Sequence, residues 1–308
     1  MAFSINTNVG AMVALQTLNS TNKSLETTQS RINTGLKVAS TKDDSGTYAI
    51  AQSLRADVGG LNAVRTSLDR AQSTLDVAIS AAESISDVLV QMKEKATAAS
   101  DEGMDQASRE ALQDDFNKLS EQLASYINSA EFNGTNILKS GGADLKALLN
   151  ADDSTQTISV GNLKLNDGTD GALKEFVGVD VNDATKAAAL EAKWIDTDAA
   201  GDPVIPPAVP DKTAAENARE SADAVNTAID QMKSVLSTLG SASRQITAQQ
   251  EFTTKLTDTI DAGIGNLVDA DLAKESARLQ ALQTKQQLGL QALAIANQAP
   301  QTILSLFR

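Results

Sequence analysis

Residues 54–92 read LRADVGGLNAVRTSLDRAQSTLDVAISAAESISDVLVQM, and they carry the clearest periodic pattern in the chain. An apolar residue recurs every seven positions, and a second apolar series follows three residues later. The first series is Leu54, Leu61, Leu68, Leu75, Ala82 and Leu89, and the second is Val64, Ala71, Ala78, Ile85 and Met92. This spacing puts both series on one helix face over more heptads than an ordinary globular helix provides. The stretch therefore predicts a long coiled-coil helix.

Helical patterns continue on both sides of this stretch. A break near residues 100–103 is followed by apolar residues at helical spacing, which predicts a second, antiparallel helix; they are Leu112, Phe116, Leu119, Leu123 and Tyr126. Upstream, one heptad stripe contains Leu15, Leu18, Leu25, Ile32 and Leu36. The turn-forming residues 41–46, TKDDSG, predict a hinge or loop after that stripe.

The last third of the chain returns to helix. From Ala222 onward one heptad edge holds Val225, Met232, Leu239 and Ile246. The stripe then changes phase through Phe252 to Leu267, which changes the face that meets a partner. Residues 286–307 form a helical stretch without any charge, and residues 1–22 mirror it, because the first charge is Lys23.

The middle of the chain has a different character. Ile158 and Val160 alternate with polar residues, Gly161-Asn162 can form a two-residue turn, and Leu163 and Leu165 resume the alternation, which together predict a β-hairpin. Four of the five prolines fall within residues 203–210, which predicts an exposed loop or insertion.

Composition excludes several classes of function. With 40 acidic and 26 basic residues, the net charge of −14 disfavours nucleic acid and anionic lipid. The chain has no His and no Cys, so a Ser-His-Asp triad, His-ligated metal sites and thiol chemistry are excluded. We expect no enzyme activity and no cofactor. Polar residues interrupt every apolar run, so we expect no membrane-inserted helix and no cleaved signal peptide.

Short sequences at both ends resemble those of bacterial flagellins. At the N-terminal side they are Ile5-Asn6-Thr7-Asn8, Arg31-Ile32-Asn33-Thr34-Gly35-Leu36, Lys42-Asp43-Asp44 and Ala49-Ile50-Ala51. At the C-terminal side they are Ala296-Asn297-Gln298-Ala299-Pro300-Gln301 and Leu304-Ser305-Leu306-Phe307-Arg308. The resemblance covers about the first 140 and last 90 residues.

The resemblance implies a mainly α fold in which long antiparallel coiled-coil helices from both ends carry a small outer region with a β-hairpin. Residues 1–44 with 266–308 would form the inner tube of a helical filament, residues 45–180 with 216–265 a surrounding helical domain, and residues 181–215 a variable outer insertion. The expected inner-tube contacts are Leu15, Leu18, Leu25, Ile32, Leu290, Leu293, Ile303, Leu306 and Phe307. The expected helix-packing residues of the surrounding domain are Leu54, Leu61, Leu68, Leu75, Val225, Met232 and Leu239.

The same resemblance implies partners and a location. The principal partner would be the chain itself, in a secreted extracellular flagellum built for motility. Further partners would be the flagellar export apparatus of type III, an export chaperone, the filament cap and the hook-junction proteins. At the site where many flagellins carry an Arg and a Leu for a Toll-like receptor, this chain has Gln91 and Lys95, which predicts weak receptor activation.

Two alternatives fit part of the pattern. A hook–filament junction protein resembles flagellin at both ends, although the match at residues 296–308 favours flagellin. A soluble coiled-coil adaptor would have folded ends in dilute solution and a small, defined oligomeric state.

Overall fold

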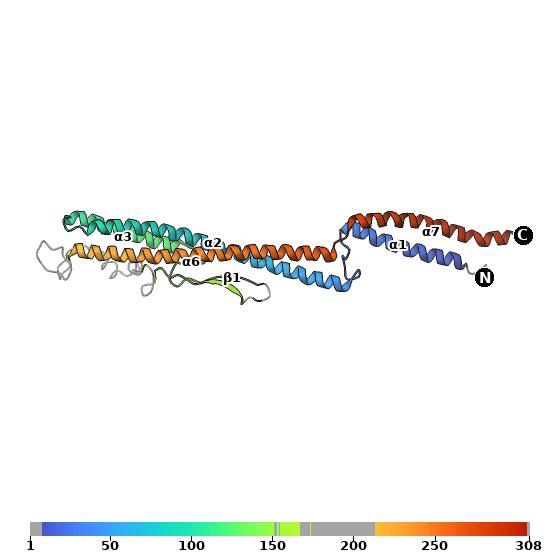
Figure 1. Cartoon of the computed structure of the whole chain (residues 1–308), viewed down its shortest axis with the longest axis horizontal. Coiled ribbons are helices and arrows are strands. Elements are labelled where there is room, and N and C mark those ends of the chain that lie inside the picture. Colours follow the sequence, from blue (N-terminus) through green and yellow to red (C-terminus); the bar gives the residue numbers. More distant parts are fainter. Residues whose placement is uncertain (1–7, 151–152, 154, 167–172, 174–212, 307–308) are drawn as a thin grey trace. The chain divides into compact units, whose positions relative to one another are not determined.

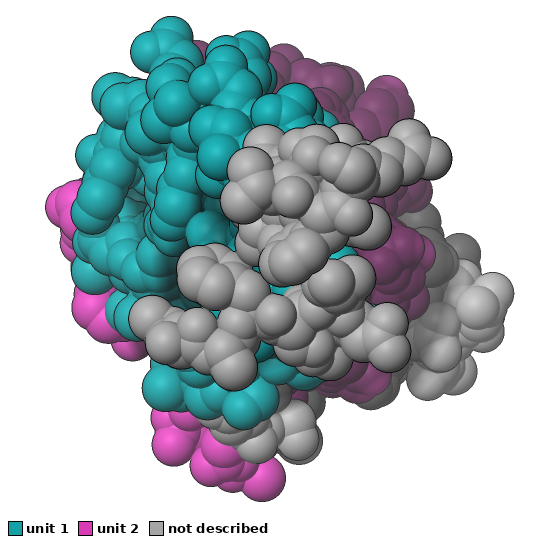
Figure 2. All heavy atoms as spheres, turned by 90° about the vertical axis from the view of Figure 1, so that its right-hand side faces the viewer, with its two compact units in different colours: residues 1–59, 256–308 teal, residues 60–255 magenta. Residues whose placement is uncertain are grey.

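The computed structural model describes residues 8–150, 153, 155–166, 173 and 213–306. These residues form two compact units, coloured separately in Figure 2. Unit 1 contains residues 1–59 and 256–308, and unit 2 contains residues 60–255. Because helices α2 (Ser45–Ala99) and α6 (Ala214–Val268) contribute residues to both units, each unit is described separately below.

Unit 2 is built on three helical segments that lie side by side, from α2, α3 (Gln106–Ser129) and α6 (Figure 1). Their apolar faces share one core cluster, in which Leu68, Leu75 and Met232 are completely buried. Polar contacts between α2 and α6 fix the antiparallel register. Gln72 Nε2 donates to Ser243 Oγ at 2.9 Å, and Gln250 Nε2 donates to Asp69 Oδ1 at 2.9 Å. The heptad pattern therefore describes the buried face of α2 in this unit.

The turn between α2 and α3 confirms the break predicted near residues 100–103. Asp105 caps α3 by accepting a hydrogen bond from the Ser108 backbone N–H at 3.0 Å. Arg109 reaches back to the end of α2, where its guanidinium donates to the carbonyls of Ala99 and Asp101 at 3.0 and 2.9 Å. The Ala99 carbonyl is at the end of α2, where carbonyls have no partner within the helix.

The β region is a two-stranded antiparallel sheet of β1 (Leu145–Leu148) and β2 (Thr157–Val160), with Leu145 opposite Val160. The sheet lies against the helices, because the Leu148 backbone N–H donates to Ser67 Oγ of α2 at 3.2 Å. Alternate side chains of both strands enter the core cluster. The mainly α fold class with a small antiparallel β region is thus confirmed.

The predicted partner strand of β2 was wrong. Leu163 and Leu165 do not pair with β2, and their backbone N–H groups donate instead to the carbonyls of Ile137 and Leu138, both at 2.8 Å. Two local features prevent the predicted hairpin. Lys164 has a positive φ of 46°, which interrupts an extended strand, and Asn162 Nδ2 donates to the Lys139 carbonyl at 2.8 Å.

Helix α6 begins at Ala214, earlier than the periodic pattern indicates. Thr213 and Glu216 form a reciprocal capping box: the Thr213 N–H donates to Glu216 Oε2 at 2.8 Å, and the Glu216 N–H donates to Thr213 Oγ1 at 3.3 Å. The predicted insertion, residues 181–215, lies outside the described residues except for 213–215.

Unit 1 contains α1 (Val9–Thr34) and α7 (Leu272–Leu306), which lie side by side in Figure 1. A small core of Val38, Ala51, Ile264 and Val268 joins the loop after α1 to the parts of α2 and α6 in this unit. The predicted loop at residues 41–46 overlaps the observed break, which is longer and begins earlier: α1 ends at Thr34, before the predicted stripe residue Leu36, and α2 begins at Ser45. Gly35 causes this early end, because it caps α1 in the left-handed conformation with φ 72°.

Helix α6 continues without interruption through Gly263 and Gly265. The chain breaks later, between Val268 and Leu272. None of the described helices has the length and apolar content of a membrane span.

Candidate assembly surface

Three polar contacts set the antiparallel register of α1 and α7. Near the start of α1, Asn8 Nδ2 donates to the Ala296 carbonyl at 2.6 Å. Midway, Gln286 Nε2 donates to Asn22 Oδ1 at 2.8 Å. At the far end, the Arg31 guanidinium pairs with the Glu275 carboxylate at 3.1 Å. The contacts are spread along the helix pair, so a shift of one helix by a turn would break all three.

Asn8 acts on both helices at once. Its side-chain oxygen accepts a hydrogen bond from the Ala11 backbone N–H at 3.1 Å, which caps α1. Its side-chain nitrogen is the group that donates to α7. A single side chain therefore caps α1 and connects its start to α7.

The Arg31–Glu275 pair is largely removed from solvent. The Glu275 side chain is 9% exposed and the Arg31 side chain is 25% exposed. Arg31 Nε and Glu275 Oε2 are buried without a hydrogen-bond partner, so the pair is only partly satisfied. Such a pair stabilises the fold modestly while both charges are present, and removal of Arg31 would leave the Glu275 carboxylate with only the Arg278 guanidinium at 4.0 Å.

A short β-bridge connects the end of α1 to the end of α6. Leu36 and Asp269 form the bridge, and the Ala270 N–H donates to the Gly35 carbonyl at 2.8 Å. The Lys37 and Val38 N–H groups both donate to the Val268 carbonyl, at 2.6 and 3.2 Å. The bridge thus gives the Val268 carbonyl at the end of α6 its hydrogen-bond donors. It also connects the segment after α1 to the segment after α6, which lie far apart in the sequence.

The loop that follows the bridge is held by two aspartates. Asp43 accepts hydrogen bonds from the Ser40 backbone N–H and hydroxyl, and these bonds hold the pKa of Asp43 below its usual 3.8. Asp44 accepts hydrogen bonds from the Thr47 backbone N–H and hydroxyl at the start of α2, and they lower the pKa of Asp44 in the same way. Both carboxylates are therefore charged at neutral pH.

The residues predicted as inner-tube contacts fall into three groups. Leu18 is buried, and Leu25, Ile32 and Leu293 are half-buried between the helices. Leu15 and Leu290 are about half exposed, at 48% and 54%. The side chains of Ile303, Leu306 and Phe307 lie outside the described part of the chain.

The helix pair also exposes apolar side chains that the sequence analysis did not single out. They are Val9, Met12 and Val13 on α1 and Leu288 and Ile295 on α7, with exposed fractions between 55% and 69%. On α7, Leu288 and Ile295 are seven residues apart and share one side, whereas Leu293 faces α1. A helix that is apolar on several sides is normally buried on several sides. This lack of a single polar face was visible in the uncharged stretch of residues 286–307.

The predicted helix-packing residues do not all lie together. Leu68, Leu75, Val225, Met232 and Leu239 belong to the core of unit 2. Leu61 is half-buried, and Leu54 packs in unit 1 against the small core around Val268.

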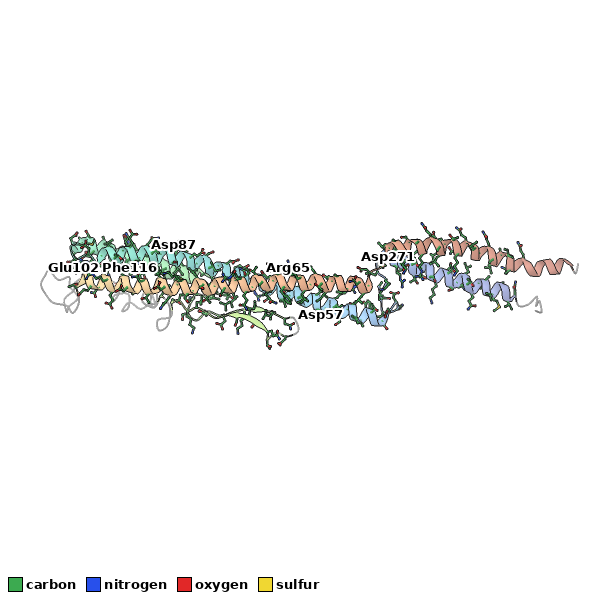
Figure 3. The ribbon with its side chains drawn as sticks, in the orientation of Figure 1. Asp57, Arg65, Asp87, Glu102, Phe116 and Asp271 are labelled. Atoms are coloured by element: carbon green, nitrogen blue, oxygen red, sulfur yellow. The ribbon has the colours of Figure 1, made fainter. Side chains whose placement is uncertain are left out.

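Gln91 and Lys95 lie one turn apart on α2. Gln91 is exposed, whereas the Lys95 ammonium pairs with Asp115 of α3 at 2.9 Å. Nearby, Glu102 pairs with Arg219 at 3.0 Å, and Figure 3 labels Glu102 and Phe116 in this part of unit 2. These exposed pairs contribute little to stability.

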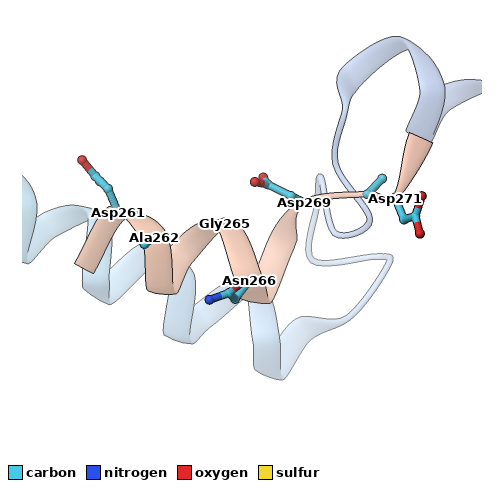
Figure 4. A pocket seen from close by; sticks show the side chains of 7 residues that line it. Asp261, Ala262, Gly265, Asn266, Asp269 and Asp271 are labelled. Atoms are coloured by element: carbon cyan, nitrogen blue, oxygen red, sulfur yellow. The ribbon is translucent and has the colours of Figure 1, made fainter. Parts of the chain in front are cut away.

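A hollow of about 530 Å³ lies beside the end of α6, lined by Asp261, Ala262, Gly265, Asn266, Asp269, Ala270 and Asp271 (Figure 4). Its carboxylates are exposed and spread over two turns and the following break. Within the described ranges, no three acidic side chains converge as a metal site requires.

Comparison with known proteins agrees with this geometry. Residues 5–142 match the family model of the bacterial flagellin N-terminal helical region, and residues 222–307 match that of the C-terminal helical region. Flagellin FljM and flagellin FljK of Caulobacter vibrioides are each 43% identical to this chain over 305 residues, covering 99% of it and 98% of themselves. The chain belongs to the bacterial flagellin family. Flagellin C of Rhizobium meliloti is 34% identical over 321 residues, covering 99% of both chains.

As a flagellin, the chain is a structural subunit of the bacterial flagellar filament and not an enzyme. Its principal partner is therefore another copy of itself. The two family matches leave residues 143–221 between them.

Proposed function

We propose that α1 and α7 of this flagellin form the inner tube of the filament by packing against the same helices of neighbouring copies. The observation that carries the proposal is the set of exposed apolar side chains on both helices: Val9, Met12, Val13, Leu288 and Ile295. These side chains are exposed, whereas Leu18 and Leu293 are covered at the contact between α1 and α7. A single subunit leaves them in water.

The energy available from this burial is substantial. Five side chains that are more than half exposed would contribute about 1–2 kcal/mol each, or roughly 5–10 kcal/mol per subunit. The absence of charge in residues 286–306 means that this burial removes no ionised group from water. Only the polymer provides the gain, so the free subunit orders these helices poorly.

The proposal divides the chain into three parts, from the inside of the filament to its outside. Residues 1–44 with 266–308 would be the inner tube, with Leu15, Leu25, Ile32, Leu290, Ile303, Leu306 and Phe307 among its contacts. Residues 45–180 with 216–265 would surround it, and residues 181–215 would be the variable outer insertion.

The family also supports a route and a destination. The flagellar export apparatus of type III would thread the chain unfolded, with an export chaperone before passage and the filament cap and hook-junction proteins after it. A chain without Cys has no disulfide to prevent unfolding. The product would be an extracellular flagellum used for motility.

We infer that Gln91 and Lys95 make the free subunit a weak activator of the Toll-like receptor that recognises many flagellins. Lys95 is engaged with Asp115, and Gln91 offers no charge. A reporter-cell assay should give weaker activation than an enteric flagellin, and the double variant Gln91→Arg/Lys95→Leu should activate more strongly. Equal activation by the unaltered chain and the enteric flagellin would contradict this inference.

The assembly proposal is tested by adding short filament seeds to purified subunits and recording growth by electron microscopy. Ile295→Asp should abolish growth, because it puts a charge where copies meet. Ile295→Leu is the matched control and should grow normally, because it keeps the apolar volume. Normal filaments from Ile295→Asp would contradict the proposal. Small uniform particles from the unaltered chain would favour the hook–filament junction protein.

A further inference from the structure

Met12 differs in its exposure from the other methionines that the structure describes. It lies in the first turn of α1, where its backbone N–H donates to the Asn8 carbonyl at 3.0 Å, and its side chain is 63% exposed. Met92 and Met232 are completely buried in the core of unit 2, and Met104 is partly buried. Among the methionines that the structure describes, Met12 is therefore the most accessible to a reagent in water.

The thioether of methionine is the only kind of sulfur that this chain contains, because it has five Met and no Cys. Hydrogen peroxide oxidises a thioether by two electrons. The sulfur attacks one peroxide oxygen, an S–O bond forms as the O–O bond breaks, and the departing hydroxide takes a proton to become water. The product is a sulfoxide, a polar group that methionine sulfoxide reductases convert back to the thioether.

Two apolar side chains flank Met12 on α1. They are Val9 and Val13, with exposed fractions of 68% and 55%. A sulfoxide buried against these two side chains at an interface would lose hydrogen bonds to water that valine cannot replace.

We propose that Met12 is a reversible modification site whose oxidation prevents the free subunit from joining the filament. This inference rests on the proposed function, because it requires that neighbouring copies bury the outer face of α1. Peroxide then acts on the subunit before assembly, whereas a subunit already in the filament is protected. Met92 and Met232 are buried and react slowly, so the same treatment should leave the fold of unit 2 intact.

The experiment treats purified subunits with dilute hydrogen peroxide, removes the reagent, maps sulfoxide by peptide mass spectrometry and measures growth from untreated seeds. We expect sulfoxide at Met12 well before Met92 or Met232, and a critical concentration for growth that rises about tenfold or more. Treatment with reductases for both sulfoxide epimers should restore the original critical concentration.

Two variants separate Met12 from the other sites. Met12→Leu keeps a helix-forming apolar side chain of similar volume but has no sulfur at this position. Its growth is compared with and without peroxide, so any effect of the substitution itself on assembly is present in both measurements. Peroxide should leave the critical concentration of this variant unchanged. Met104→Leu is the matched control and should remain as sensitive as the unaltered chain. Full oxidation of Met12 without a change in growth, or equal inhibition of Met12→Leu, would overturn the inference. Failure of untreated subunits to grow from seeds would instead overturn the proposed function, and this inference with it.

Discussion

Arg31 Nη1 lies 3.1 Å from Glu275 Oε1, so an ion pair joins the last turn of α1 to the first turn of α7. Arg31 stabilises the C-terminus of α1, because a cation there interacts favourably with the helix dipole. Glu275 stabilises the N-terminus of α7, because an anion is favoured at that end. The pair also lies close in sequence to Gly35 and Asp271, where the two helices end and begin. One contact therefore supports both helices and their register.

Removal of one member of this pair should destabilise the filament. Arg31→Leu leaves the buried Glu275 carboxylate with only the more distant Arg278 guanidinium at 4.0 Å, and we expect a loss of about 1–2 kcal/mol per subunit. The double variant Arg31→Leu/Glu275→Leu should recover most of this loss, because no buried charge remains. Filament melting measured by calorimetry gives both values. Equal melting temperatures for the unaltered chain and Arg31→Leu would show that the pair is not buried in the filament.

Gly35 should be sensitive to substitution through its backbone alone. No atom lies within 4 Å of a Cβ built there, but its φ of 72° is unfavourable for other residues. Gly35→Ala should cost about 1–2 kcal/mol and slow filament growth. The control is Gly59→Ala, which also has open space but lies inside α2 with a helical backbone.

This control should give the opposite sign, because alanine favours the helix by about 0.5–1 kcal/mol relative to glycine. The free energy of unfolding of both variants, measured with urea, tests this difference in sign. Destabilisation by Gly59→Ala of the same size as that by Gly35→Ala would contradict the assignment of the effect to the positive φ.

Asn136 should be important for the stability of unit 2. Its side-chain nitrogen donates to the Ile127 carbonyl at 2.7 Å, and its oxygen accepts from the N–H groups of Leu138 and Lys139 at 2.9 and 3.0 Å. Because the residue is buried, Asn136→Ala should cost about 2–3 kcal/mol in the free energy of unfolding.

Urea unfolding of the free subunit measures this cost. The exposed helical residue Asn62 provides a control, since Asn62→Ala should be neutral or slightly stabilising. A loss below about 0.5 kcal/mol for Asn136→Ala would mean that water replaces the three hydrogen bonds.

The Lys95–Asp115 pair predicts a pH dependence at both ends of the scale. The hydrogen bond from Lys95 holds the pKa of Asp115 below its usual 3.8, so this contribution to stability is complete above 3.8 and is lost as the pH falls through the lowered pKa. The same hydrogen bond, donated to Asp115, raises the pKa of Lys95 above 10.5, so this contribution is complete below 10.5 and is lost as the pH rises through the raised pKa. Because the pair is largely exposed, Asp115→Asn should lower the unfolding temperature only slightly at pH 7 and leave it nearly unchanged at pH 2. An equal effect at both pH values would exclude the ion pair as its cause.

The heptad pattern predicted the core of unit 2 because the pattern is local. Leu68 and Leu75 are buried by the face that their spacing defines, and tertiary contacts agree with that local preference. The capping box of Thr213 and Glu216 was equally local and would have placed the start of α6 correctly.

The errors arose where distant segments decide the structure. Leu36 continues the heptad stripe, yet the chain leaves the helix before it because Gly35 and the bridge to Asp269 offer a different partner. Leu163 and Leu165 alternate as a strand would, but Ile137 and Leu138 accept their N–H groups. A local periodic pattern gives no information about such partners, because they lie elsewhere in the sequence. The exposed face of α7 was likewise missed, because residues were assigned from one stripe on a helix that is apolar on several sides.

The most direct test of the central claim is thiol labelling of a single engineered cysteine, since the chain has no Cys of its own. Ile295 lies on the exposed side of α7 that it shares with Leu288. The thiol of Ile295→Cys should react rapidly with a maleimide in free subunits and be protected in assembled filaments. Labelling at equal rates in both forms would show that neighbouring copies do not cover this face, and would contradict the proposed inner tube.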